Sequence, residues 1–335
     1  MKKLSIFIVA IMLFISCGFF TGCKDKNTIR LNEVTHSIFY APLYVAINKG
    51  YFEEEGLKIE LTNGGGADST MTAILSGDAD IGLMGPEAAI YVVAGEAQNK
   101  PVVFGQLTKR DGSFIVSKTE DNNFDWSKLA NTTIIGGRKG GVPAMTLEYC
   151  IKQSNLEIGT NAGQVNLRTD VAFNLTASVF DSTDAEYCTL FEPNATQLCN
   201  EKGYHIVDSV GRLSGEIPYT AFAAKESYLK NNKEQAKKFL KAVVRGYRFL
   251  TSATPEEIAQ AIAPSFTGVS NEDLVAAINS YISIDAWMST PVMQESAYNR
   301  LLDIMESAGE LDERVAFNDV VDNTIAREVI AELNA

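Results

Sequence analysis

The sequence predicts an α/β protein with two lobes, two segments that cross between them, and a helical carboxyl-terminal part. Three observations support this fold class. Between residues 29 and 93, short apolar stretches alternate with stretches of helical spacing, an order typical of parallel sheets with right-handed crossovers. The alternation resumes between residues 126 and 210, after a polar stretch at 107–113. From residue 225 onward nearly every stretch has helical spacing.

The first lobe begins with three pairs of strand and helix. Strand patterns cover residues 29–34, 58–62, 81–84 and 102–106. Pro42 and Pro86 are each expected in the first turn of a helix, where the missing N–H is tolerated. Asp68 is expected to cap the helix between them, which ends before Gly77.

The second lobe repeats this order after the first crossing. Strand patterns cover residues 114–117, 133–136, 165–167, 187–190 and 205–210. Helical patterns cover a short turn at 126–129 and longer stretches at 143–154, 173–180 and 193–202. A return crossing at 214–218 leads into a strand at 219–224. Two crossings form a hinge, which permits closure around a ligand.

The carboxyl-terminal helices are located by their start signals. Thr254 and Ser270 each have an acid three residues later, which is the spacing of an N-terminal cap. Two further helices are expected to begin at Pro291 and Asn318. We therefore assign residues 29–108 and 216–335 to lobe 1, and residues 109–215 to lobe 2.

Residues 1–22 have the pattern of a lipoprotein signal peptide. Two lysines precede an apolar run at 4–16 that is too short for a transmembrane helix. The small residues before Cys23 resemble a lipidation site, with residues 23–28 as a short tether. The alternatives are a plain secretory cysteine and the use of Cys17. Lipid on Cys23 would hold an extracytoplasmic protein at the cell membrane.

The chain is acidic, with a formal net charge of −13 from 29 basic and 42 acidic residues. This balance argues against nucleic acid as a partner. The two histidines argue against a zinc site of familiar spacing, and no metal or cofactor is expected. Cys150, Cys188 and Cys199 are expected to be buried free thiols, although the short separation of the last two leaves a bridge open.

Three loops of the first lobe follow the carboxyl end of a strand and precede a helix. In open parallel sheets ligands bind at this edge, where free backbone N–H groups and positive helix ends gather. Aromatic faces suit a small organic ligand, and glycines let the backbone approach it closely. The candidate residues in these loops are Ser37, Phe39, Tyr40, Gly65, Gly66, Gly85, Pro86 and Glu87.

Each of these candidates has a plain alternative. The aromatic residues could be core packing, the glycines an ordinary turn, and Glu87 a first-turn acid. If Glu87 faces the crevice, it favours a ligand with a hydrogen-bond donor or a cation. Arg138, Gly140 and Gly141 precede a helix in the second lobe, an arrangement that attracts anions, or else a solvated turn.

Three segments carry a family resemblance. They are FYAPLYVAINKGYFEEEGLKIEL at residues 39–61, GGGADSTMTAILSGDADIGLMGPE at 64–87 and LFEPNA at 190–195. They resemble the substrate-binding proteins of ABC importers, in the branch of nitrate, sulfonate and taurine binders and thiamine-pyrimidine-precursor (NMT1/THI5-like) binders. The resemblance implies a type II periplasmic-binding-protein-like fold. It places Glu192 at the lip of lobe 2, as a ligand contact or a helix cap.

The resemblance implies a non-enzymatic, monomeric lipoprotein that captures a small organic solute and delivers it to an ABC permease with its ATPase subunits. The ligand stays open among sulfonate, nitrate, taurine, and pyrimidine or another heterocycle. The alternative is an enzyme, because the yeast pyrimidine synthase of thiamine biosynthesis resembles this branch. That enzyme has a cysteine-rich stretch and a helix-borne histidine. This chain has neither, so His36 is expected to be a hydrogen-bonded loop residue.

Overall fold

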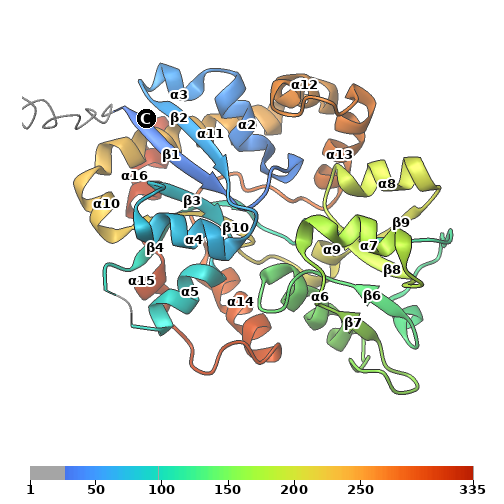
Figure 1. Ribbon diagram of the computed structural model, residues 1–335. Coiled ribbons are helices and arrows are strands. Elements are labelled where there is room, and N and C mark those ends of the chain that lie inside the picture. Colours follow the sequence, from blue (N-terminus) through green and yellow to red (C-terminus); the bar gives the residue numbers. More distant parts are fainter. Residues whose placement is uncertain (1–26, 97, 335) are drawn as a thin grey trace, which may run out of the picture.

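The computed structural model describes residues 27–96 and 98–334 as two lobes, each built on a five-stranded sheet (Figure 1). The predicted signal peptide, Cys23 and most of the tether lie outside the described residues. The two-lobed α/β prediction is confirmed. In the described part of the chain, no helix is both long and apolar enough to cross a membrane.

The first sheet has the strand order β2-β1-β3-β10-β4. Its strands are β1 (Thr28–Glu33), β2 (Lys58–Asn63), β3 (Ile81–Met84), β4 (Pro101–Thr108) and β10 (Thr220–Lys225). Strand β1 pairs in parallel with β2 and β3, as the alternating pattern predicts. Strand β10 returns from the second lobe and lies antiparallel between β3 and β4. The sheet is therefore mixed.

The second sheet has the order β7-β6-β8-β5-β9. Its strands are β5 (Phe114–Ser117), β6 (Thr133–Ile135), β7 (Asn166–Arg168), β8 (Tyr187–Leu190) and β9 (His205–Ser209). Strand β6 is parallel to β7 and β8, whereas β5, which enters from the first lobe, is antiparallel to β8 and β9. In each sheet, the strand that arrives through a crossing segment runs against its neighbours.

The helices of the first lobe follow its strands. They are η1 (Ile38–Tyr40), α2 (Ala41–Asn48), α3 (Tyr51–Glu54), α4 (Ala67–Ser76) and α5 (Glu87–Ala94). Those of the second lobe are η2 (Trp126–Leu129), α6 (Val142–Gln153), η3 (Phe173–Leu175), α7 (Thr176–Ser182), α8 (Asn194–Lys202) and α9 (Val210–Ser214). Helices α5 and α6 begin at the cleft, one from each lobe, so their amino ends face the same space.

The carboxyl-terminal part is helical and contacts both lobes. Its helices are α10 (Glu226–Asn231), α11 (Lys233–Ser252), α12 (Pro255–Ile262), η4 (Ala263–Ser265), α13 (Asn271–Ser283), α14 (Glu295–Ser307), α15 (Phe317–Val320) and α16 (Thr324–Leu333). Helix α11 packs on α2 in the first lobe, while α13 packs on α8 and α14 on α6 in the second. The predicted caps at Thr254 and Ser270 are confirmed.

Three predicted helix starts are wrong. Gly66 occupies the cap position of α4, and Asp68 lies in its first turn. Pro291 lies in a bend, where its carbonyl accepts from the N–H of Gln106, and α14 begins only at Glu295. Asn318 lies inside the short helix α15, while α16 begins at Thr324. Asp68 and Asn318 thus lie within helices rather than at their caps, and only Pro291 lies outside a helix.

Candidate functional site

A pocket with a volume of about 100 Å³ lies between the lobes, at the strand ends that the sequence indicates. Both lobes and the return crossing contribute to its wall. Nine of the predicted site residues line it: Ser37, Phe39, Tyr40, Gly65, Gly66, Gly85, Glu87, Arg138 and Gly141. Pro86, Gly140 and Glu192 do not belong to the lining. The sequence analysis did not single out Thr35, Val142, Pro143, Phe173, Phe191, Tyr219 and Thr220, which also line it.

Glu87 is a buried acid at the amino end of α5, only 3% exposed. Its carboxylate folds back over Gly85. A Cβ atom placed on this glycine would lie only 1.9 Å from Oε2 of Glu87, so a larger residue there would displace the carboxylate. Oε2 has no hydrogen-bond partner among residues 27–96 and 98–334. Burial raises the pKa of Glu87 to about 7, and the backbone N–H groups of Glu87, Val142 and Ala88 act in the opposite direction. A buried carboxylate oxygen therefore faces the pocket and is available to a ligand.

The same carboxylate acts on the amino ends of two helices. Glu87 and Ala88 open α5 in the first lobe, and Val142 opens α6 in the second. Such helix ends are the positions at which a bound anion is usually held. Here an acid of the protein itself lies against both, in the position that a bound anion would take.

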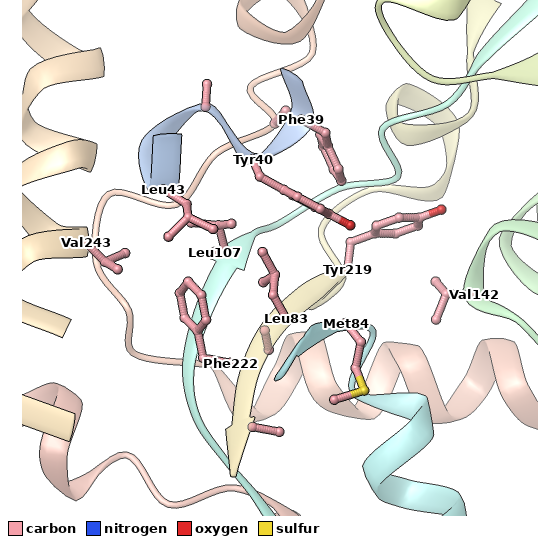
Figure 2. Close-up of a cluster of buried hydrophobic side chains, with 14 of the residues drawn as sticks. Phe39, Tyr40, Leu43, Leu83, Met84, Leu107, Val142, Tyr219, Phe222 and Val243 are labelled. Carbon is pink, nitrogen blue, oxygen red and sulfur yellow. The ribbon is translucent and has the colours of Figure 1, made fainter. Parts of the chain in front are cut away.

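Aromatic rings form the apolar wall of the pocket. Figure 2 shows Tyr40 and Tyr219 reaching over the core of the first lobe toward Val142 of the second. Phe173 and Phe191 add rings from the second lobe, with their centroids 5.5 Å apart. Rings on several sides favour a small, flat ligand.

Phe39 is as much a packing residue as a pocket residue, since it is 1% exposed. Its ring centroid lies 5.6 Å from that of Phe191, 5.7 Å from Tyr219 and 5.1 Å from Tyr281. An added Cβ on Gly112 would lie 2.6 Å from its ring, so the first crossing passes directly over it. Phe39 thus joins the first lobe, the second lobe, both crossings and α13.

Glu192 caps a helix and lies outside the pocket. Its carboxylate accepts hydrogen bonds of 2.9 Å from the N–H and the hydroxyl of Thr196, in the first turn of α8. Burial raises its pKa, and the bonds from Thr196 oppose the shift. Of the two roles weighed from the sequence, the geometry favours the helix cap.

Arg138 lies at the mouth of the pocket, with its side chain half exposed. Its Nη2 lies 3.0 Å from Oδ2 of Asp68 on α4, so the ion pair crosses from one lobe to the other. Nearby, the hydroxyl of Tyr91 donates to the carbonyl of Gly140 at 3.0 Å. These contacts join the rims of the two lobes in this structure.

His36 is held in a loop, as expected. Its ring nitrogens lie 2.8 Å from Oε1 of Glu33 and 2.7 Å from the carbonyl oxygen of Ser265. The hydrogen bond to Glu33 raises the pKa of His36, with burial opposing. The residue is not part of the pocket lining.

The described cysteines have no disulfide between them. Cys150 and Cys188 are buried, and Cys199 is half-buried. The expectation of free thiols is therefore confirmed within residues 27–96 and 98–334. In that same part of the chain, no group of three or more His, Cys, Asp and Glu side chains is arranged to hold a metal ion.

Two signals in the sequence could have located the missed aromatic residues. Phe191 precedes Glu192 in the segment LFEPNA, and Tyr219 follows the predicted return crossing directly. Both positions follow from the fold, because a strand end of the second lobe and a hinge segment must border a cleft between lobes. Phe173 has no comparable signal, since it lies in the short helix η3 between β7 and α7.

The comparisons with known proteins agree with this architecture. The "NMT1/THI5 like" family model matches residues 38–258. YtlA of Bacillus subtilis (strain 168), whose name assigns it provisionally as a binding protein, is 39% identical over 315 residues, which are 93% of each chain. A pyrimidine phosphate synthase of Aspergillus parasiticus is 42% identical, but over only 64 residues, 19% of this chain and 18% of the enzyme.

Solved structures share the fold at low sequence identity. The periplasmic nitrate-binding protein NrtA of Synechocystis PCC 6803 superposes with a TM-score of 0.70 at 17% identity, covering 92% of this chain and 89% of its own. The ligand-binding component of an ABC-type import system from Staphylococcus aureus has a TM-score of 0.70 at 13% identity, covering 90% and 99%. Because the family model matches more than half of the chain, and YtlA is similar along nearly its whole length, the chain belongs to the NMT1/THI5-like family.

Proposed function

We propose that the chain is the extracytoplasmic solute-binding component of an ABC importer. The observation that carries the proposal is the pocket, whose wall is shared between the lobes and encloses the buried carboxylate of Glu87. A solute that touches both lobes binds the closed arrangement best, and so shifts the population toward it. A permease can then distinguish the loaded protein from the empty one.

The proposed ligand is a small, flat organic compound with an N–H donor, such as an aminated nitrogen heterocycle. An N–H group would satisfy the free Oε2 of Glu87, while the ring of the ligand packs against Tyr40 and Tyr219. A ligand oxyanion would instead meet Glu87 at the helix ends that normally hold anions. The pocket therefore favours heterocycles over nitrate and sulfonates.

The remaining parts of the proposal concern delivery. Lobe 1 would comprise residues 29–108 and 216–335, and lobe 2 residues 109–215, with closure about the two crossings. Lipid on Cys23 would hold the protein at the outer face of the membrane beside its permease and ATPase subunits. A single copy suffices, because one chain supplies both walls of the pocket.

A thermal-shift screen of the chain from Lys24 onward tests the proposal. The panel contains nitrate, methanesulfonate, taurine, 4-aminopyrimidine and pyrimidine, which lacks the amino donor. A ligand at 100 times its Kd adds about 2.7 kcal/mol to the free energy of unfolding. We expect a shift with 4-aminopyrimidine that exceeds the shift with pyrimidine. Shifts with the anions alone would contradict the proposed ligand class.

An enzyme of pyrimidine synthesis is the second candidate, because 64 residues resemble such an enzyme. The position of His36 argues for binding instead, since both of its ring nitrogens are engaged outside the pocket. Incubation with the aminopyrimidine, followed by mass spectrometry, separates the two functions. A binding protein returns the compound unchanged, whereas a new product mass would favour the enzyme.

A further inference from the structure

The two crossing segments run side by side at the hinge. The N–H of Ile217 donates to the carbonyl of Lys109 at 3.0 Å, and the hydroxyls of Thr108 and Thr220 lie 2.6 Å apart. The first crossing, residues 109–113, and the return crossing, residues 215–219, therefore form one bonded unit. A side chain fixed in one segment can restrain a side chain carried by the other.

Asp111, in the first crossing, is fully buried. Its Oδ1 accepts hydrogen bonds from the N–H and the hydroxyl of Ser113, which fixes the carboxyl group. Its Oδ2 has no hydrogen-bond partner within the described ranges 27–96 and 98–334. A buried carboxylate oxygen without a partner is costly, so this one requires an explanation.

Tyr219, in the return crossing, presents the matching donor. Its hydroxyl is also buried without a hydrogen-bond partner in the part of the chain that the structure describes, and its ring lines the pocket. The carboxyl group of Asp111 and the hydroxyl of Tyr219 each shift the pKa of the other. Burial raises the pKa of Asp111 to about 7, with Tyr219 among the groups that oppose the shift. Burial and then Asp111 raise the pKa of Tyr219.

We infer that Asp111 is a positioning residue for the pocket: its free carboxylate oxygen takes the hydroxyl of Tyr219 and fixes this ring as the hinge-side wall of the solute site. This hydrogen bond satisfies two buried polar atoms at once. The bond joins the crossings beside the pocket, so the geometry of the hinge and the shape of the site are set together.

Other titratable groups surround the pair. Cys150 on α6 faces Asp111, and Tyr40 and Glu87 face Tyr219 from the pocket side. Tyr40 and Glu87 favour a proton on Tyr219, and the thiol of Cys150 donates to the carbonyl of Val210 at 3.7 Å. Tyr219 is therefore the donor left for a charged Asp111. The bond is strongest when Asp111 is ionised, because hydrogen bonds to charged acceptors are about twice as strong as neutral ones.

A double-mutant cycle on the ligand-free protein tests the inference. Urea unfolding is measured for wild type, Asp111→Asn, Tyr219→Phe and the double variant at pH 8.5 and pH 5.5. At pH 8.5 we expect Tyr219→Phe to raise the equilibrium constant for unfolding about fivefold in the wild-type background. In the Asp111→Asn background we expect the same substitution to raise it less than about twofold. At pH 5.5 this difference shrinks, because Asp111 is protonated. Equal effects in both backgrounds at both pH values would overturn the inference.

Tyr228→Phe is the matched control. Its hydroxyl is also buried without a hydrogen-bond partner in the described chain, but it lies beside Arg30 and Asp80, away from the hinge. We expect its effect to be the same with and without Asp111→Asn at both pH values. If Asp111→Asn fails to fold, the pH dependence of Tyr219→Phe in the wild-type background still decides, because a role confined to packing would not vary with pH.

A second experiment measures ligand binding and rests on the proposed function. It titrates the same variants with 4-aminopyrimidine in a calorimeter. Asp111→Asn and Tyr219→Phe are expected to weaken its binding by the same factor, and the double variant no further. Independent losses that multiply would overturn the positioning role. If wild type does not bind this probe, the proposed ligand class fails, while the unfolding cycle still decides whether Asp111 holds Tyr219.

Discussion

The hydroxyl of Ser37 donates a hydrogen bond of 3.1 Å to the backbone carbonyl of Glu192, which lies 155 residues further along the chain. The N–H of Glu192 in turn donates to the hydroxyl of Tyr281 on α13 at 3.0 Å. The backbone of Glu192 is therefore held from the first lobe and from the carboxyl-terminal helices, while its carboxylate caps α8. The acid in the segment LFEPNA has a structural position beside the site.

Glu192 variants test this position. Glu192→Ala leaves the N–H of Thr196 without its acceptor, and loss of such a cap costs about 0.5–2 kcal/mol in the free energy of unfolding. Glu192→Gln keeps an acceptor oxygen and should lose less. Urea denaturation measures both. A variant that keeps its stability but loses most of its affinity for the solute would instead place Glu192 among the ligand contacts.

Phe39→Ala should destabilise the whole protein as well as alter the pocket. The ring is buried against Phe191, Tyr219 and Tyr281, so its removal leaves a cavity that costs about 3–5 kcal/mol. Phe39→Leu fills most of that space and should cost much less. Denaturant unfolding distinguishes the two. An alanine variant as stable as wild type would mean that Phe39 serves the ligand alone.

Stability should fall as pH rises from about 4.5 to about 7. Burial raises the pKa values of Glu87 and Asp111 to about 7, above their ordinary values near 4. The folded state then holds protons that the unfolded state has lost, so the loss is of order 3 kcal/mol for each group and is complete above pH 7. Glu87→Gln and Asp111→Asn should each flatten the profile. Profiles parallel to wild type would contradict the assignment.

Cys23→Ala tests the membrane anchor. Removing the acceptor of the lipid should move the protein from the membrane fraction to the soluble extracytoplasmic fraction, because a processed chain without lipid has only the short polar tether left. Cys17→Ala is the matched control and should remain with the membrane. Complete membrane retention of Cys23→Ala, measured by fractionation and immunoblotting, would show that this cysteine is not the anchor.

Much of the site follows from the sequence, because the topology brings the ends of parallel strands to one edge. Once β1 and β3 are located, the loops that carry Ser37 and Glu87 must border the same crevice. Local patterns do not reveal the direction of a side chain, however. Arg138 pairs with Asp68 at the rim, and Glu192 turns back onto α8. The first outcome depends on the approach of one lobe to the other, and the second on a contact within the first turn of α8.

Contacts between distant segments also shape the region in which helix starts were wrongly predicted at Pro291 and Asn318. The side chain of Asn323 accepts from the N–H of Met293 at 3.0 Å and donates to its carbonyl at 2.9 Å, so the segment before α14 is tied to the start of α16. Pro291 takes part in the edge of the first sheet through Gln106. Proline and asparagine begin helices often, yet the same preferences suit extended segments and loops that meet a distant partner.

The most direct test of the account is calorimetric titration of wild type and Glu87→Gln with 4-aminopyrimidine and with nitrate. The account predicts that wild type binds the aminopyrimidine with 1:1 stoichiometry and that Glu87→Gln weakens this binding at least about tenfold, because a charged acceptor is replaced by a neutral one. It also predicts no heat of binding with nitrate. Tight binding of nitrate to wild type, or unchanged aminopyrimidine affinity in Glu87→Gln, would contradict the central role given to this carboxylate.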